Sequence, residues 1–403
     1  MGSVARARVP GPLAPFADGF RAELDRLGYT PASREYKVNQ MSRLSRWLGC
    51  RGLGVGDLDG CVVGEFLADF GAGRRRRLTV RSMRPLMEWL RGEGLAGSDP
   101  PPARRAVDDL MDRYCSWMLT ERGLAERTIG RYAETARRFL AGRAAAAGGG
   151  TGAEGLDAAS VIAFLLAEAA RGLAPGSVQG RVAELRSLLR FLHLAGVITS
   201  PLAAVVPPVP GWKDTAVPRR VTAAQVRTLL GSCDQATAAG KRDFAMLMLL
   251  ARLGLRAAEV AGLRLADFDW RAGELAVCGK GRRSDRMPLP ADVGEAVACY
   301  VVQARPRAGS GTVFLSIAAP PCPVGSTGVS EMVHRRCVQA GLAPVRAHRL
   351  RHALATDLLD RGFTLPEIGQ VLRQRDLATT AVYAKVDHAA LRTLALPWPA
   401  GAW

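Results

Sequence analysis

The sequence of 403 residues has no long uninterrupted apolar run and no nucleotide-binding loop. Its longest apolar stretch, residues 244–255, is interrupted by Arg252 and is too short to span a bilayer. The N-terminus carries no apolar signal core, and no Gly-x-x-x-x-Gly-Lys-Ser/Thr motif occurs. These absences argue against a membrane protein, a secreted protein and a P-loop ATPase or GTPase.

Paired cysteines are also missing. None of the eight cysteines forms a Cys-x-x-Cys motif, and none stands at zinc-finger spacing from a histidine. We therefore expect no metal site, and we expect buried free thiols in a reducing cytoplasm. The cysteines are Cys50, Cys61, Cys115, Cys233, Cys278, Cys299, Cys322 and Cys337.

Acidic residues and lysines are scarce relative to arginine. Lys+Arg is 55 and Asp+Glu is 37, so the net charge is +18 and the pI is about 10.4. This excess indicates a polyanionic partner, most simply double-stranded DNA. Rich use of Arg, Ala and Gly is also typical of a GC-rich genome, so composition alone does not assign a function. Only five lysines occur, so a lysine in a functional position stands out: Lys37, Lys213, Lys241, Lys280 and Lys385.

Proline-rich and apolar-poor stretches divide the chain into blocks. Their composition predicts a flexible lead-in, two helical blocks, a linker, a larger third block and a short tail. The expected bounds are 1–15, 16–98, 107–200, 201–215, 216–396 and 397–403.

The two helical blocks resemble each other in order and spacing. Leu58-Asp59 followed by Phe66-Leu67 matches Leu156-Asp157 followed by Phe164-Leu165 at the same spacing, and Trp47-Leu48 matches Phe139-Leu140 in order. A longer match pairs residues 83–90 with residues 185–192, and a glycine follows each at the same distance. We interpret the blocks as a tandem duplication. The competing interpretation is that amphipathic helices of similar length resemble each other by chance.

The third block mixes helices with a small sheet. Val221-Thr222-Ala-Ala-Gln225 is a capping box that begins a helix, and residues 244–253 predict a buried helix. Residues 274–278 and 286–289 predict two strands joined by a basic turn at residues 279–283. Further helices are expected at 293–303, 329–340, 349–361 and 366–373. The fold class is therefore mainly α, with two tandem helical domains before a mixed α+β domain.

Five residues of this block suit phosphodiester cleavage by a tyrosine. Arg256 and Arg351 offer charged forks for phosphate oxygens, and such preorganised charge is usually the largest catalytic contribution. His348, three residues before Arg351, shares its helix face and suits a base for Tyr383. Lys280, on the hairpin turn, suits the acid that protonates the leaving oxygen.

Each residue alone has an ordinary structural explanation. Arg256 suits a surface or capping role, Lys280 a solvated turn, and Tyr383 a core position anchored by its hydroxyl. His348-x-x-Arg351 occurs in many helices. Only the combination, in this order and on these elements, favours a catalytic site.

The same motifs resemble a known family. Residues 216–396 are similar to the catalytic domain of the tyrosine recombinase (phage integrase) family, and residues 107–200 to its SAM-like core-binding domain. The matching segments are Leu253-Gly-Leu-Arg256-Ala-Ala-Glu259, Gly279-Lys280-Gly281, His348-Arg-Leu-Arg351-His352, Asp376-Leu-Ala-Thr379-Thr380-Ala-Val-Tyr383, Gly123-Leu124 and Thr128-Ile129-x-x-Tyr132.

The resemblance implies a role for each matched position. Arg256 and Arg351 would hold the scissile phosphate, Lys280 would protonate the 5′ oxygen, and His348 would activate Tyr383 to form a 3′-phosphotyrosyl bond. Two further residues would support these: Glu259 by orienting Arg256, and His352 by supporting the phosphate site or helix packing. No metal or ATP would be required.

One position departs from the family pattern. A histidine or tryptophan usually stands nine residues before the nucleophile, where this sequence has Gln374. Since tryptophan is accepted there, the position calls for a hydrogen-bond donor, and a glutamine amide can donate. We expect a weakened or reshaped active site rather than a dead one; the alternative is a decayed copy in a mobile element.

The sequence thus predicts a site-specific recombinase or integrase of a mobile element, serving integration or transposition. Expected DNA contacts lie at Arg74, Arg75, Arg76, Arg77, Arg282 and Arg283. We expect a tetrameric assembly of the chain on DNA, with partner recombinases a further option, in the cytoplasm at the nucleoid. The alternatives are a type IB topoisomerase-like enzyme, a resolution factor for replicon dimers and a catalytically impaired DNA-binding protein.

Overall fold

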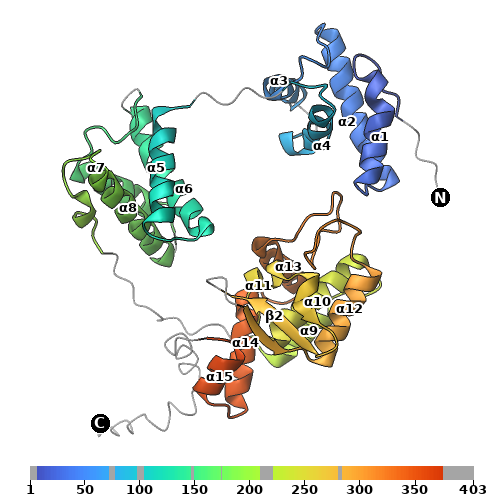
Figure 1. The fold of residues 1–403 in the computed structure, drawn as a ribbon, viewed down its shortest axis with the longest axis vertical. Coiled ribbons are helices and arrows are strands. Elements are labelled where there is room, and N and C mark those ends of the chain that lie inside the picture. The colour runs from blue at the N-terminus through green and yellow to red at the C-terminus, as the bar shows by residue number, and fades with distance from the viewer. Residues whose placement is uncertain are drawn as a thin grey trace, which may run out of the picture. The chain divides into compact units, whose positions relative to one another are not determined.

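The computed structural model describes residues 7–71, 78–97, 104–146, 149–173, 175–208, 221–279 and 284–374. They form three blocks, each with its own hydrophobic core, and Figure 1 shows each block's helices. The third block also carries a small sheet. The mainly helical fold class with one mixed block is confirmed. No helix in these ranges is long and apolar enough to cross a membrane.

The first block is a small helical bundle whose boundaries follow from local sequence. Gly28 adopts φ +79° after the first long helix, a conformation that glycine reaches at low cost. The Thr30 side chain then accepts a hydrogen bond from the Ser33 N–H and caps the next helix, which begins at Pro31. The elements are η1 (Ala14–Phe16), α1 (Ala17–Arg26), α2 (Pro31–Cys50), α3 (Gly60–Gly71) and α4 (Val80–Gly92).

The second block has the same number of long helices and lies within the compact unit Pro100–Thr215. Asp157 caps its third helix by accepting a hydrogen bond from the Ser160 N–H at 2.9 Å. The elements are α5 (Ala106–Thr120), α6 (Glu126–Ala146), α7 (Ala158–Ala170), α8 (Pro175–Leu194) and η2 (Leu202–Ala204).

Matched positions of the two blocks make matched contacts. Trp47 meets Phe66 edge to face at 5.7 Å, and their counterparts Phe139 and Phe164 meet edge to face at 5.0 Å. The interplanar angle is 66° in both pairs. The last helices are also buried at equivalent positions: Met83, Leu86, Met87 and Leu90 in α4, and Leu185, Leu188, Leu189 and Leu192 in α8. Shared packing of this kind favours duplication over chance resemblance.

The third block begins with the expected capping box. Thr222 accepts from the Gln225 N–H, and the Gln225 side chain accepts from the Thr222 N–H. The helices that follow are α9 (Ala223–Gly231), α10 (Ala238–Arg252), α11 (Ala257–Gly262), η3 (Leu265–Asp267), α12 (Ala291–Gln303), α13 (Ser326–Gln339), α14 (Ala347–Asp360) and α15 (Leu365–Val371).

An antiparallel sheet of three strands, in the order β1-β2-β3, lies between α11 and α12 in sequence. The strands are β1 (Phe268–Asp269), β2 (Glu274–Cys278) and β3 (Ser284–Pro288). Leu275 of β2 pairs with Phe268 on one side and Met287 on the other. The predicted hairpin is present, with its second strand two residues earlier than expected at its start. β1 was not predicted because two residues are too short to show alternation.

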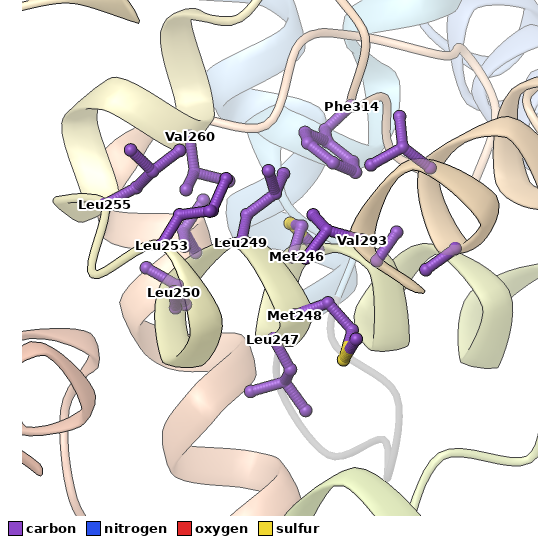
Figure 2. Packing of buried hydrophobic residues seen from close by; sticks show 14 of the residues in the cluster. Met246, Leu247, Met248, Leu249, Leu250, Leu253, Leu255, Val260, Val293 and Phe314 are labelled. Carbon is purple, nitrogen blue, oxygen red and sulfur yellow. The ribbon is translucent and has the colours of Figure 1, made fainter. Parts of the chain in front are cut away.

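Helix α10 forms the centre of the third core. Residues 245–251 are all buried, and α10 packs against α12 and α14. Figure 2 shows its apolar side chains gathered with Leu255, Val260, Val293 and Phe314. Because α10 is surrounded, the turn after it is held in a fixed position, and that turn carries the candidate site.

The expectation that all cysteines are buried is wrong. The eight thiols are free, but only Cys233 and Cys337 are buried, while Cys50, Cys61, Cys278 and Cys322 are exposed. Cys50 and Cys278 are the last residues of α2 and β2, where neighbouring elements no longer cover a side chain. Cys50 and Cys278 are exposed because each lies at the end of its helix or strand.

Candidate functional site

The turn between α10 and α11 presents Arg256. Gly254 adopts φ +59°, which allows the chain to reverse into α11, and Arg256 caps that helix. Glu259, one turn later, accepts from the Arg256 N–H at 2.8 Å and from its Nη1 at 2.7 Å. The Arg256 side chain is 42% exposed while Glu259 is 5% exposed. The pair therefore fixes a guanidinium that still faces solvent.

Helix α14 contributes a second arginine from the other side of the same turn. Arg351 is 1% exposed. Its Nη1 donates to the Gly254 carbonyl at 2.6 Å, and its Nη2 donates to the Leu372 carbonyl. Arg351 therefore joins the turn before Arg256 to the end of α15. The predicted pair of arginines is brought to one place, with Arg256 exposed and Arg351 buried.

Two histidines of α14 lie one turn apart beside these arginines. The rings of His348 and His352 meet edge to face, with centroids 4.3 Å apart. Burial, then the charges of Arg351, Arg256 and Arg349, lowers the pKa of His348 below its ordinary value. Burial, followed by the effect of His348, lowers the pKa of His352 to about 4. Both imidazoles are therefore neutral at pH 7 and able to accept a proton.

A third arginine, which the sequence analysis missed, completes the cluster. The Nη2 of Arg373 donates to Glu259 Oε2 at 2.8 Å, and the Arg373 side chain is 12% exposed. Burial alone would raise the pKa of Glu259. The Arg256 N–H, the Arg373 charge and the Arg256 side chain outweigh burial and lower it. One ionised carboxylate therefore holds two arginines from distant parts of the chain.

Gln374 directly follows this arginine. Its N–H donates to the Gly369 carbonyl at 2.8 Å, so its backbone is fixed at the end of α15. Several predicted site residues lie outside the described residues: Lys280, Tyr383, Arg74, Arg75, Arg76, Arg77, Arg282 and Arg283. The structure thus brings together the two arginines, the two histidines, Glu259 and Gln374.

This arrangement suits an anionic substrate. The exposed Arg256 guanidinium offers parallel N–H donors to two oxygens, and a neutral imidazole lies on the neighbouring helix. Such a pair can hold a phosphate group and accept a proton from an attacking hydroxyl. Among the residues that the structure describes, no group of three or more His, Cys, Asp or Glu side chains could hold a metal ion.

Comparison with known proteins finds relatives that match most of the chain. The family model described as "Phage integrase family" matches residues 219–390. The chain is 39% identical over 403 residues to the "Putative integrase/recombinase y4rA" of Sinorhizobium fredii, with 98% of this chain and 97% of that protein covered. It is 31% identical to the tyrosine recombinase XerD of Xanthomonas campestris, with 73% and 93% covered.

Solved structures give the same fold. A lambda integrase (75–356) dimer bound to a COC′ core site matches with a TM-score of 0.51 at 18% identity, with 68% of this chain and 94% of that chain covered. The mainly helical architecture with a small sheet is therefore that of the phage integrases.

Proposed function

The chain belongs to the phage integrase family of tyrosine recombinases, enzymes that cleave and rejoin DNA, and from this premise we propose how its own residues do so. Tyr383 attacks the scissile phosphate, and the 5′ oxygen leaves as a 3′-phosphotyrosyl bond forms. That bond conserves the energy of the phosphodiester. Rejoining by the 5′ hydroxyl therefore needs no ATP, and we propose that no metal is needed.

The observation that carries this proposal is the meeting of three charged or titrating groups at one turn. Arg256 stands two residues after Gly254, and Arg351 donates to the Gly254 carbonyl. Burial, then the charges of Arg351 and Arg256, lowers the pKa of His348. We assign the phosphate to Arg256, whose guanidinium is exposed, and to Arg351, which is buried here on two carbonyls and must turn toward the phosphate to bind it. We assign the proton of Tyr383 to His348. The arginine charges also favour the ionised phenol, whose ordinary pKa is about 10.

The remaining roles fall on Lys280, which lies outside the described ranges, and on Gln374, Glu259 and His352, which lie within them. Lys280 protonates the leaving 5′ oxygen, and the Gln374 amide donates to the phosphate. Glu259 orients Arg256 through the hydrogen bonds described above. His352 supports His348 by ring contact.

DNA binding rests on charge. The net charge of +18 supports a duplex DNA partner, with Arg74–Arg77, Arg282 and Arg283 on its phosphates. We propose that residues 107–200 and 216–396 grip the core site and that residues 16–98 bind flanking DNA or a neighbouring protomer. The active form is a homo-oligomer on DNA, a tetramer when two sites are joined, in the cytoplasm at the nucleoid.

The biological setting we propose is integration or transposition of a mobile element. It is supported by the relative named integrase/recombinase, which matches nearly the whole chain. Resolution of replicon dimers uses the same chemistry, and XerD-type relatives match 73% of the chain. A plasmid assay distinguishes a recombinase from a topoisomerase. A recombinase exchanges DNA between two copies of its site on a plasmid, whereas a topoisomerase relaxes supercoils in DNA without a site.

Covalent trapping tests the proposal. Nicked duplexes tiled across the DNA that flanks the protein's own gene are screened for binding, and bound tiles are incubated without Mg²⁺ and run on denaturing gels. A shifted band that is lost in Tyr383→Phe supports the proposal. Specific binding with no band contradicts it and favours the impaired DNA-binding alternative. Gln374→His then shows whether glutamine is the cause.

A further inference from the structure

Arg373 occupies a backbone position that ordinarily suits glycine. Its φ is +53°, and it is the one non-glycine residue with positive φ among the described residues. The Arg373 N–H donates to the Gln370 carbonyl and the Gln374 N–H to the Gly369 carbonyl, the double pattern that ends a helix through a left-handed residue. A side chain with a Cβ is disfavoured there, so the presence of arginine calls for a role of its guanidinium.

That guanidinium reaches the carboxylate that holds Arg256. Glu259 Oε2 receives both the Arg373 Nη2 and the Arg256 N–H, each at 2.8 Å, while Oε1 receives the Arg256 Nη1. The Arg373 and Glu259 side chains are 12% and 5% exposed, so their ion pair is little screened by solvent. Arg373 therefore acts on Arg256 through a shared and nearly buried carboxylate.

The backbone beside Arg373 is held by the other arginine. The Leu372 carbonyl accepts from Arg351, which also donates to the Gly254 carbonyl. Residues 372 and 373 are thus tied to both proposed phosphate-binding arginines, one through a carbonyl and one through Glu259. The next residue is Gln374, and Tyr383 follows nine residues later.

We propose that Arg373 is a positioning residue for DNA cleavage: through Glu259 it sets the orientation of Arg256. The proposal rests on the proposed function. It concerns geometry at the site, so it predicts a loss in the rate of cleavage with DNA affinity retained.

Arg373→Gly is the decisive variant. Glycine suits φ +53°, so removing the side chain relieves the backbone while it removes the ion pair. The melting temperature is expected to stay within about 3 °C of the parent and DNA affinity within about 3-fold, whereas the rate of covalent adduct formation falls about 10–100-fold. Arg373→Lys keeps the charge and is expected to recover most of the rate.

Arg361→Gly is the matched control. Arg361 pairs with Asp357 at 3.0 Å at the C-terminal end of α14, where its side chain is 67% exposed, and its loss is expected to leave adduct formation unchanged. Adduct formation by Arg373→Gly at the parent rate overturns the proposal, as does a loss matched by equal losses of stability and DNA affinity. If the parent protein forms no adduct, the proposed function itself is contradicted, and the proposal for Arg373 loses its premise.

Discussion

Substitution of Gly254 by alanine tests how tightly the turn before Arg256 is constrained. The glycine has φ +59°, and a Cβ there would lie 2.7 Å from Leu372 Cδ2 and 3.0 Å from Leu354 Cδ2. The left-handed backbone costs about 1–2 kcal/mol for a residue with a Cβ. Displacing two leucine side chains in a packed site adds about 1–3 kcal/mol. We therefore expect Gly254→Ala to lower the free energy of unfolding by about 2–5 kcal/mol.

Gly341→Ala is the matched control in the same block. Gly341 has φ +67°, but nothing lies within 4 Å of the position of an added Cβ. This variant should lose only the backbone contribution, about 1–2 kcal/mol. Guanidinium unfolding of both variants isolates the crowding contribution as their difference.

The same comparison extends to catalysis. Leu372 carries the carbonyl that Arg351 holds, so its displacement should slow adduct formation in Gly254→Ala and leave Gly341→Ala unaffected. Equal stability of the two variants would refute the packing that we describe around Arg351.

Three further predictions follow from buried or catalytic charges. The pKa of His352 is about 4 in the folded protein and about 6.5 in the unfolded chain, so the unfolded state binds one more proton between these pH values. The free energy of unfolding should therefore fall by about 1–2 kcal/mol from pH 7.5 to 5.0. A His352→Gln variant whose free energy of unfolding falls as steeply with pH as that of the parent would contradict this. Glu184 is 2% exposed and accepts from Arg181 at 2.9 Å, so Glu184→Gln should lower the free energy of unfolding in urea by about 2–4 kcal/mol. Glu88→Gln, in the exposed pair with Arg84, should lower it by less than about 1 kcal/mol, and equal losses would contradict the burial of Glu184. Lys280→Ala should slow cleavage of ordinary DNA about 10²–10⁴-fold. DNA in which sulfur replaces the leaving 5′ oxygen should restore the rate of this variant, because a thiolate leaves without being protonated. Failure of that rescue would contradict the role of Lys280 as the acid.

Local features of the fold were readable from the sequence. The capping box at Thr222 and Gln225 depends on residues three apart, and the hairpin depends on a pattern within fifteen residues, Glu274 to Pro288. The hypothesis of tandem blocks rests on short segments of equal spacing, such as residues 83–90 and 185–192, and the matched ring contacts at Trp47 and Phe139 support it. These signals are short-range, so one chain suffices to read them.

Long-range features of the site were not readable. The bond between Arg373 and Glu259 joins residues 114 positions apart, and no periodicity marks it. The burial of Arg351 was also unforeseen, because it depends on two carbonyls that α10 and α15 bring to α14. Motifs pointed to Arg256, Arg351 and His348 but not to Arg373, and packing decided which of the arginines faces solvent.

The central claim is that Tyr383 forms a covalent bond to DNA, and mass spectrometry of the trapped adduct tests it most directly. The adduct is digested with nuclease and protease, and the modified peptide is sequenced. The account predicts a nucleotide attached through its 3′ phosphate to Tyr383. Attachment to another residue, or through a 5′ phosphate, would contradict it.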